Sequence, residues 1–581
     1  MNSSRTIQTS RSADLVTFKI RIDGTELPAT VQVMNISVEK EINRIPTARL
    51  VFTDGDPSGQ NFSLSSSEQF VPGKAVEIKA GYHSDEETIF KGIIVKHSLK
   101  IRSGYSLLTV ECKDKAVKLT AGRKSKYFLD SKDSDAFEEI IGAYGVAADV
   151  EATSFQHQKL VQYDCTDWDF LVTRAQANGK VVVVDDGKIT VKAPDTAQPE
   201  IETVAFGSSL LDFDAEMDAR NQFSKVSSYA WSHANQELVE QEAANPSLAL
   251  NGNVSPDDLA AVVGLENLEL KFGGTVGDQS VKDWANAKAL FNQLAKTRGR
   301  ARFQGIPACK PNTTLKLEGV GDRFNGKIYI SAVRHEITEG QWTIDAQFGI
   351  NPEWFAETNK ISDLPAAGLF GAVHGLQIAI VTQLESDPDG EDRVRIKCPM
   401  IDKDSEGIWA RVASLDAGDN RGAFFRPEID DEVIVGFIND NPNEPVILGM
   451  LNSSAKPAPI KASDDNHEKG FVTRSEMKFI FNDDKKSVVL ETPKGKKITV
   501  DEDSGIIQLE DENSNKLTMN SDGIKIESGK DIILKATGDV KTEGINIEMK
   551  AQASLKAEGS ASAEVKASGT LTLKGAMVQI N

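Results

Sequence analysis

The sequence has few of the side chains that form covalent cross-links or metal sites. Its 581 residues include seven histidines and four widely separated cysteines, with no C-x-x-C pair and no histidine at ligand spacing: Cys112, Cys165, Cys309 and Cys398. Disulfide frameworks are typical of small secreted chains, and this chain is not small. We therefore expect four buried thiols in a reducing compartment, with neither a metal site nor a cofactor.

Long hydrophobic runs are also missing. No stretch approaches the roughly 20 apolar residues that a membrane-spanning helix needs, and Val181–Val184 lies inside a short strand pattern. The first residues, Met-Asn-Ser-Ser-Arg-Thr, lead into no apolar segment. A secretory signal peptide is therefore not expected.

Positive charge is in deficit. The chain has 66 Lys and Arg against 87 Asp and Glu, a formal charge of −21. Phosphate backbones and anionic lipid surfaces attract the opposite sign, so nucleic acid and membrane surfaces are not expected partners. With 39% hydrophobic and 26% charged residues, the composition is that of a folded chain with room for about three to five domains.

The first 365 residues have the pattern of a β-rich module with a few helices. Apolar and polar residues alternate along Val16–Ile22, Val76–Ala80 and Leu108–Cys112. A period of two is the signal of a half-buried strand. These three segments are therefore predicted strands.

Two helices are predicted within this module. Apolar residues at helical spacing indicate a helix over Asp135–Tyr144, with Gly145 at its C-terminal cap. Thr166 is followed three residues later by Asp169, which is capping-box spacing. This second helix should end at Gly179.

A hairpin and a third helix follow. Val181–Val184 and the apolar pair Ile189 and Val191 flank the dipeptide Asp186-Gly187, a typical two-residue hairpin turn. The third helix is predicted to begin near Ser280, with Asp283 in the capping-box position.

Residues 366–455 have a different sequence pattern from the first 365 residues. Short alternating segments are separated by Asp-Pro-Asp-Gly, Arg-Pro and Asn-Pro, which predicts a small barrel or sandwich. Phe370–Asn452 holds 16 acidic and 7 basic residues, so about −9 of the formal charge lies there.

Residues 456–581 comprise a linker and a tail of very short repeats. From Ser528 the tail has no proline, cysteine or aromatic residue, and its 7 Lys nearly balance 6 Asp and Glu. Short segments with one apolar and one charged face recur at Ile532–Lys535, Ile545–Lys550, Ser554–Glu558, Ala563–Ala567 and Leu571–Lys574.

Strands this short cannot bury a core within one chain. Repeats solve this problem by stacking, and steps of roughly eight to ten residues suit a prism to which several chains contribute a face. We therefore predict an intertwined homo-oligomeric β-helix, a trimer. A disordered tail is the alternative, but disorder gives no reason for a period of two.

Three candidate chemical sites are weak. Gly321–Ile328 has nearly the spacing of a phosphate-binding loop, but Ile328 stands where Ser or Thr would hold the metal. Asp387–Asp392 alternates carboxylates around a glycine without the calcium-loop register. His335 lies mid-strand among apolar neighbours and fits a core or groove position. A glycosidase carboxylate pair would show only in space, so no catalytic constellation is identified.

Several segments resemble the VgrG spike family of bacterial contractile injection systems, itself similar to the fused hub and spike of contractile phage tails. Those in the first module are Phe90–Ile94, Val161–Leu171 with Arg174 and Gly179, Gly319–Gly326, and Val333–Ile337. The Gly319–Gly326 likeness also explains the phosphate-loop mimic as a barrel turn.

The middle region carries the most specific likeness, to the OB-fold neck of such spikes. Asp430 or Asp431 replaces a glycine of the family pattern, which should affect only a turn. The tail resembles the family's triple-stranded β-helix and closes on Gly575–Asn581. The neck segments are Asp392–Lys397, Ile408–Val412, Ala417–Gly418, Pro427–Phe437, Asn441–Gly449 and Asn452.

The resemblance implies a mainly β fold in three parts: an α+β, two-barrel, phage-hub-like domain (1–365), an OB-fold neck (366–455), and a linker with an intertwined triple-stranded β-helix (456–581). It implies a homotrimer that caps an Hcp-like inner tube, contacts baseplate components, carries effector cargo and punctures the target envelope when the sheath contracts. Such a protein is made in the bacterial cytoplasm and delivered outside or into a target cell.

Family members often carry a conical PAAR-repeat protein on the blunt end of the β-helix. By this likeness the tip residues here are Val578, Gln579, Ile580 and Asn581. The acidic stretches Asp387–Asp392 and Asp430–Glu432 suggest a further contact with basic baseplate or adaptor proteins.

We do not expect an enzyme. Some relatives insert a lysozyme domain between neck and β-helix or append an effector after it, but only about twenty residues separate Gly449 from Phe471 and no domain follows the last strand. One alternative is a trimeric tailspike that degrades carbohydrate, although the tail lacks the aromatic residues typical of such enzymes. The sequence leaves open whether the particle is a membrane-anchored type VI machine, a released particle or phage-like.

Overall fold

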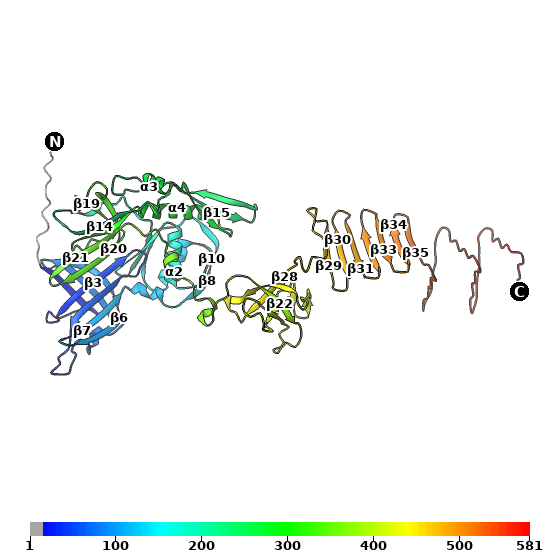
Figure 1. Ribbon diagram of the computed structural model, residues 1–581, viewed down its shortest axis with the longest axis horizontal. Coiled ribbons are helices and arrows are strands. Elements are labelled where there is room, and N and C mark those ends of the chain that lie inside the picture. The colour runs from blue at the N-terminus through cyan, green and yellow to red at the C-terminus, as the bar shows by residue number, and fades with distance from the viewer. Residues whose placement is uncertain (1–14, 581) are drawn as a thin grey trace. The chain divides into compact units, whose positions relative to one another are not determined.

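The computed structural model describes residues 15–580 (Figure 1). Strands dominate, and the chain divides into two compact units. The first unit extends to Val373 and includes Asn439–Pro442, and the second holds His374–Ile438 and the chain from Asn443 onward. No helix in the described part of the chain is long and apolar enough to cross a membrane.

A 13-stranded sheet forms most of the first unit. Its main path runs β14-β18-β21-β20-β3-β4-β7-β6-β5-β1-β2, and β13 and β19 join it through β20. The strands are β1 Val16–Ile22, β2 Thr25–Glu26, β3 Val33–Glu41, β4 Thr47–Thr53, β5 Ala75–Tyr82, β6 Asp85–Arg102, β7 Tyr105–Lys113, β13 Glu200–Ala205, β14 Leu210–Met217, β18 Thr297–Gln304, β19 Thr314–Glu318, β20 Gly326–Thr338 and β21 Gln341–Phe348. The predicted strands at Val16–Ile22, Val76–Ala80 and Leu108–Cys112 are confirmed.

The sheet carries two separate hydrophobic cores. Leu50, Phe52 and Phe90 lie in the first, and Phe303 and Phe348 in the second. The two halves of the sheet join where β20 pairs antiparallel with β3. The two barrels that the resemblance implied stay a prediction, because the strands of both cores belong to one continuous sheet.

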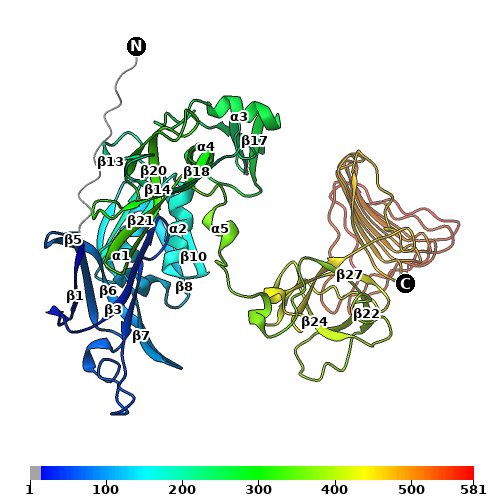
Figure 2. The same ribbon diagram turned by 60° about the vertical axis from the view of Figure 1, so that its left-hand side comes forward.

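A smaller α+β part is inserted between the two halves and has its own core. Its helices cover one side of the ribbon β8–β10, beside which α2 lies in both views (Figures 1 and 2). The elements are η2 Lys115–Thr120, β8 Lys124–Lys132, α1 Asp133–Gly142, β9 Ala147–Val150, β10 Gln156–Cys165, α2 Asp167–Ala177, β11 Val181–Asp185 and β12 Lys188–Lys192.

Local signals located these elements well. Helix α1 begins two residues before its predicted start, and the Thr166 hydroxyl accepts a hydrogen bond from Asp169 N at the start of α2, as predicted. In the predicted hairpin, Asp186 and Gly187 have φ values of 52° and 86°. Positive φ at both positions suits the right-handed twist of the paired strands β11 and β12.

The predicted cap of the third helix is wrong. Helix α4 (Asp278–Leu294) has Gly277 at its N-cap, so no side chain caps it. Asp283 instead accepts hydrogen bonds from Ser154 Oγ at 3.0 Å and from Gln279. Helix α4 packs on the sheet formed by β15 Lys225–Ser232, β16 Glu237–Glu242 and β17 Asn267–Phe272. Helix α3, Pro256–Val263, lies between β16 and β17 in the chain. Helix α5 covers Phe355–Thr358.

The second unit opens with a closed five-stranded barrel in the order β22-β23-β24-β28-β27. Its buried residues include Val381, Ile396 and Val435. Asp430, at a family-like glycine position, has φ +70° in the turn before β27, a conformation that Asp tolerates better than most side chains. The strands are β22 Gln377–Gln383, β23 Val394–Lys397, β24 Ile408–Val412, β27 Glu432–Phe437 and β28 Pro445–Met450, and the short pair β25 Ala417–Gly418 and β26 Arg421–Gly422 lies outside the barrel.

A seven-stranded antiparallel meander follows the barrel. Each strand has five residues and pairs with the next one along the chain. The strands are β29 Glu468–Val472, β30 Lys478–Asn482, β31 Ser487–Glu491, β32 Lys497–Asp501, β33 Ile506–Glu510, β34 Lys516–Asn520 and β35 Gly523–Glu527. This pairing within one chain was not predicted, since the short repeats were recognised only from Ser528.

In the single chain, the segment after the meander does not form the strands that were predicted for it. Strands were predicted from Ile532 to Lys574, but residues 528–580 contain no assigned strand and their side chains are mostly exposed. A strand is defined by backbone pairing, and one copy of these short repeats offers no neighbouring strand to pair with.

Candidate functional site

The meander has one face made almost entirely of apolar side chains. Strand register places them in two parallel rows across the sheet. The first row is Phe479, Leu490, Ile498, Leu509, Leu517 and Ile526, and the second is Phe481, Val488, Val500, Ile507, Met519 and Ile524.

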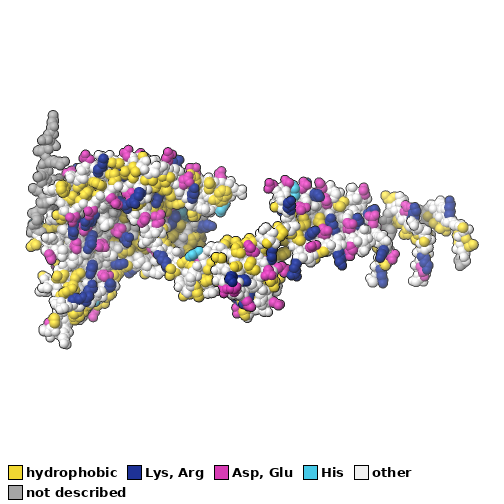
Figure 3. All heavy atoms as spheres, viewed as in Figure 1, with side chains coloured by type: hydrophobic (Ala, Val, Ile, Leu, Met, Phe, Trp, Pro, Cys, Tyr) yellow, Lys and Arg dark blue, Asp and Glu magenta, His cyan; other side chains and the backbone are white. Residues whose placement is uncertain are grey.

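This apolar face is uncovered in the single chain. Leu490 is 45% exposed, Leu509 44% and Ile526 56%. Yellow side chains gather along this part of the chain in Figure 3. Soluble monomers rarely leave a contiguous apolar surface of this extent exposed, and such a surface marks an interaction site. We call it the meander face.

A row of alternating charge crosses the same strands. Lys478, Glu491, Lys497, Glu510, Lys516 and Glu527 are successive cross-strand neighbours. Lys516 Nζ lies 3.0 Å from Glu510 Oε1. Opposite charges placed directly across strands favour this register, and a slip by one residue would turn the apolar rows to the other face.

Sequence reasoning missed the meander face. A signal was present, because each segment from Lys478 to Glu527 has two apolar residues spaced by two, with Lys or Glu at one end. The turns between them hide the repeat, since their lengths differ.

The predicted tip residues lie at the end of the described chain. Val578 is 52% exposed and Ile580 84%. Gln579 lies between them, and Asn581 lies outside the described residues. The single chain therefore presents these side chains without burying them in a site.

The acidic loop of the neck is organised by ion pairs within the chain. Asp387 accepts hydrogen bonds from Arg393 Nη2 at 2.6 Å and Nε at 3.1 Å, and from Glu391 N at 2.9 Å. The Arg393 side chain holds the pKa of Asp387 well below its usual range. Asp392 pairs with Arg426 and Asp431 with Lys456. Across Asp387–Asp392 and Asp430–Glu432, seven carboxylates meet only these basic partners, so net negative charge remains and the suggested basic partner stays a prediction.

Other candidate groups take structural positions. Gly321–Ile328 forms the turn between β19 and β20 and the start of β20, as the barrel-turn interpretation predicts. All four cysteines are buried, and burial raises the pKa of Cys112 and Cys309 to about 12. Within residues 15–580, no group of three or more His, Cys, Asp or Glu side chains is arranged to hold a metal ion.

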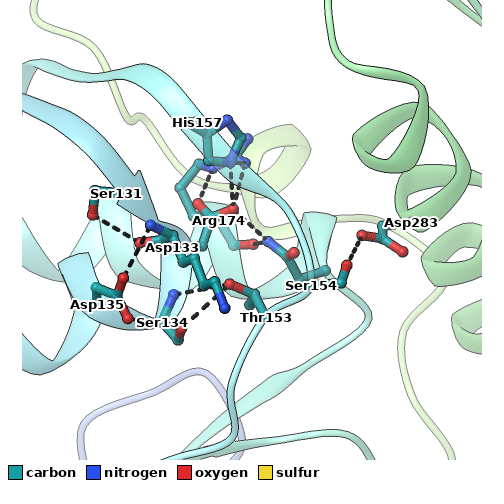
Figure 4. Close-up of polar contacts among 11 residues, drawn as sticks. Ser131, Asp133, Ser134, Asp135, Thr153, Ser154, His157, Arg174 and Asp283 are labelled. Carbon is teal, nitrogen blue, oxygen red and sulfur yellow. Dashed lines mark hydrogen bonds and ion pairs between the residues drawn. The ribbon is translucent and has the colours of Figure 1, made fainter.

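A buried ionic cluster explains the helix motif that ends in Arg174 (Figure 4). Asp133, at the start of α1, is 1% exposed. Its carboxylate accepts hydrogen bonds from Arg174 Nε at 2.7 Å and Nη2 at 2.8 Å and from Asn178 Nδ2 at 3.0 Å, and it lies 2.9 Å from His157 Nε2. The cluster therefore ties α1, β10 and α2 together.

The hydrogen bonds decide the ionisation of Asp133. Burial alone would raise its pKa, but the bonds from His157 and Arg174 outweigh burial and hold the pKa far below the usual range. A carboxylate with a lowered pKa stabilises the fold above its unfolded pKa, and this contribution is lost as the pH falls through the folded pKa.

His335 lies in a second buried cluster, on β20. Lys40 bridges Asp185 and Asp186, and Lys310 Nζ donates to Asp185 Oδ2 at 2.7 Å. Burial, with the positive charges of Lys40 and Lys310, lowers the pKa of His335 to about 3. The predicted core position of His335 is confirmed, and its imidazole is neutral at physiological pH.

Comparisons with known proteins agree with this architecture. A family model described as the Alg8 N-terminal domain matches residues 12–339, more than half of the chain. The chain belongs to the Alg8 N-terminal domain family. A second family model, the type VI secretion system/phage-baseplate injector OB domain, matches residues 377–451, which contain the closed barrel.

Members of the VgrG spike family are relatives of this Alg8 N-terminal domain protein, so the resemblance is confirmed. VgrG1b of Pseudomonas aeruginosa is 22% identical over 72% of this chain and 60% of its own length. VgrG3 of Vibrio cholerae is 28% identical over 34% of this chain and 21% of its own length. The chain therefore spans less than two thirds of the length of these curated relatives.

Two of the solved structures that match this chain have TM-scores below 0.5. The 43 kDa tail protein of prophage MuSo2 from Shewanella oneidensis is 11% identical over 58% of this chain and 98% of its own, with a TM-score of 0.45. A Francisella PdpA–VgrG complex is 10% identical over 89% of this chain and 88% of its own, with a TM-score of 0.37.

Removing the charge of Asp133 should destabilise the first unit. Asp133→Asn leaves Arg174 without its buried partner, and breaking such a pair costs about 3 kcal/mol of unfolding free energy. Glu138→Gln, the same change at an exposed site on α1, is the control. Chemical denaturation checks the prediction, and equal stabilities of the two variants would contradict it.

The neutral His335 should make stability depend on pH. Between about pH 6.5 and about pH 3 the unfolded chain binds a proton on this histidine that the folded chain does not, so stability falls as the pH falls. From about pH 7 to about pH 5 this contribution is about 2 kcal/mol.

His335→Gln should remove that contribution, whereas His83→Gln, at an exposed histidine, should retain it. The measurement is the denaturation midpoint of each variant at the two pH values. An unchanged pH dependence in His335→Gln would refute the assignment.

Proposed function

We propose that this protein is the structural spike and hub of a contractile injection system. The first unit caps the inner tube, and the second carries the neck and the spike that punctures the target envelope when the sheath contracts. The observation that carries the proposal is the uncovered meander face directly after an injector OB domain. The role is mechanical, and no catalytic step is assigned to the chain.

The meander face supports assembly from three copies. Twelve side chains stand in two rows, ten of them between 37% and 71% exposed, and burying them would contribute on the order of 10 kcal/mol per chain. Three such sheets can turn their apolar faces to a common axis as the sides of a prism. The polar side chains on the other face, including Gln508 and Lys525, then point away from the axis.

The segment after Glu527 supports an intertwined continuation. Its backbone groups form no strand within the chain, and buried N–H and C=O groups need partners. Strands from two further copies supply them. The meander therefore pairs within each chain and associates through side chains, whereas residues 528–580 pair between chains.

This construction suits a part that transmits force along its axis. Each strand of the closed prism has neighbours on both sides, so no lateral edge is free to unravel. The charged exterior gives no apolar surface that would lodge in lipid.

The partners follow from the same role. We propose an Hcp-like inner-tube protein and baseplate components at the first unit, and a PAAR-repeat tip protein at Val578–Asn581. Effector cargo travels with the spike. The protein is made in the bacterial cytoplasm and is delivered outside the cell or into a target cell.

A charge in the meander face should abolish assembly. Leu509→Asp places a carboxylate in the prism interior three times, at several kcal/mol for each unpaired charge. We expect the native mass by light scattering to fall from about 189 kDa, three chains of 63.1 kDa, to one chain.

Gln508→Asp is the matched control, because residue 508 is the neighbouring position on the opposite face. It should leave the mass of three chains unchanged. A wild-type mass of one or two chains would refute the three-fold spike.

Charges at the tip should release the cap. Val578→Asp combined with Ile580→Asp should abolish co-purification of a PAAR-repeat protein encoded in the same genome, because apolar contact is lost at three symmetric sites. Light scattering should still report three chains. Undiminished co-purification would place the tip protein elsewhere.

A further inference from the structure

We propose that a basic pocket in the first unit binds a small phosphate ester, a ligand that the spike role does not require. The pocket has a volume of about 360 Å³. Strands β1, β5 and β6 of the large sheet line one side, and η2, the segment after α1 and the β11–β12 turn of the inserted part line the other. Small-molecule sites typically have volumes of roughly 300–1,000 Å³, so the pocket suits a small ligand.

Hydrogen bonds within the first unit hold the sides of the pocket together. Asp114 is completely buried, and its carboxylate accepts hydrogen bonds from Ala116 N of η2 at 2.9 Å and from Gly187 N of the β11–β12 turn at 2.8 Å. Asp186, in the same turn, accepts a hydrogen bond from Lys91 N of β6 at 2.9 Å. These elements are therefore positioned before a ligand binds, which lowers the entropic cost of binding.

The two acidic side chains that line the pocket already have cationic partners. Asp186 lies 3.2 Å from Nζ of Lys40, which is 2% exposed. Glu77 lies 3.4 Å from Lys91 Nζ and 3.6 Å from Arg21 Nη1. The carboxylates of the pocket are thus engaged by other cations.

Lys115 and Lys118 of η2 supply positive charge that is not compensated. Both line the pocket and both are exposed. Within residues 15–580 neither forms an ion pair. Residues three apart in a 3₁₀-helix lie above one another, at a rise of about 2 Å per residue, so both ammonium groups can reach one ligand. Like charges at this separation repel each other, and an anion bound between them removes the repulsion.

The type of cation favours a phosphate monoester over a carboxylate. A phosphate monoester carries a charge of about −1.5 to −2 at pH 7 and has three strong acceptor oxygens, whereas a carboxylate carries a single charge. Two lysine ammonium groups offer six N–H donors and two positive charges. Bidentate binding of a carboxylate is typical of arginine, and Arg21 of this pocket already contacts Glu26 and Glu77.

The remaining lining accommodates an organic group on the phosphate. Val76 and Val146 are buried side chains that line the pocket, and Tyr144 lines it as well. Gly24 and Gly145 also belong to the lining, and a Cβ atom added at either would meet no atom within 4 Å. Apolar surface removed from water adds affinity, so we expect an ester to bind more tightly than inorganic phosphate.

Isothermal titration calorimetry on the full-length protein in a phosphate-free buffer tests the inference. The probes are phenyl phosphate, inorganic phosphate and benzoate, and we expect phenyl phosphate to bind most tightly. Lys115→Gln combined with Lys118→Gln should weaken its binding by roughly tenfold or more, because two charge-assisted hydrogen bonds are lost. Lys100→Gln combined with Lys159→Gln removes two exposed lysines outside the pocket. This control should bind phenyl phosphate as the wild type does.

Each other outcome overturns a stated part of the inference. Absence of phenyl phosphate binding to the wild type, or an equal loss in the two paired variants, overturns the pocket as a binding site. Benzoate binding as tight as that of phenyl phosphate overturns the phosphate class, and equal binding of inorganic phosphate overturns the ester. Light scattering should report three chains for both paired variants, so the inference can fail while the proposed spike stands.

Discussion

The part of the molecule after the neck is governed by one constraint, which a single chain cannot satisfy. Apolar side chains must leave water and buried backbone groups must find hydrogen-bond partners. The meander meets the second requirement by pairing each strand with the next, but its apolar rows remain uncovered. Residues 528–580 meet neither requirement. Both deficits disappear if three copies share one axis, so the structure after the neck depends on assembly.

The first unit is built on the opposite principle. Its sheet carries two hydrophobic cores, and the inserted α+β part has a third. Buried charges occur with their partners, as in the contacts of Asp133 with Arg174 and of Lys40 with Asp185. The neck likewise neutralises Asp387 with Arg393. The first unit thus closes its cores within one chain, whereas the meander does not.

The sequence predicted what local patterns determine. The Thr166 cap, the Asp186-Gly187 turn and the alternation at Val16–Ile22 each depend on a few neighbouring residues, and each was located correctly. Helix α4 begins within two residues of its predicted start, but Asp283 is not its cap and instead accepts a hydrogen bond from Ser154, which is distant in sequence. The Asp133 cluster and the meander face depend on which segments meet in space. The Asp133 partners come from segments distant in sequence, so local patterns could not predict them, whereas the short repeats from Ser528 did predict assembly from several chains.

Hydrogen exchange of the backbone amides between Ile532 and Ile580 in the full-length protein tests the central claim most directly. If these strands pair between chains, their amides should exchange orders of magnitude more slowly than in an unfolded peptide, with protection comparable to that of the meander strands. Exchange at the rate of an unfolded peptide in the native assembly would contradict the intertwined spike.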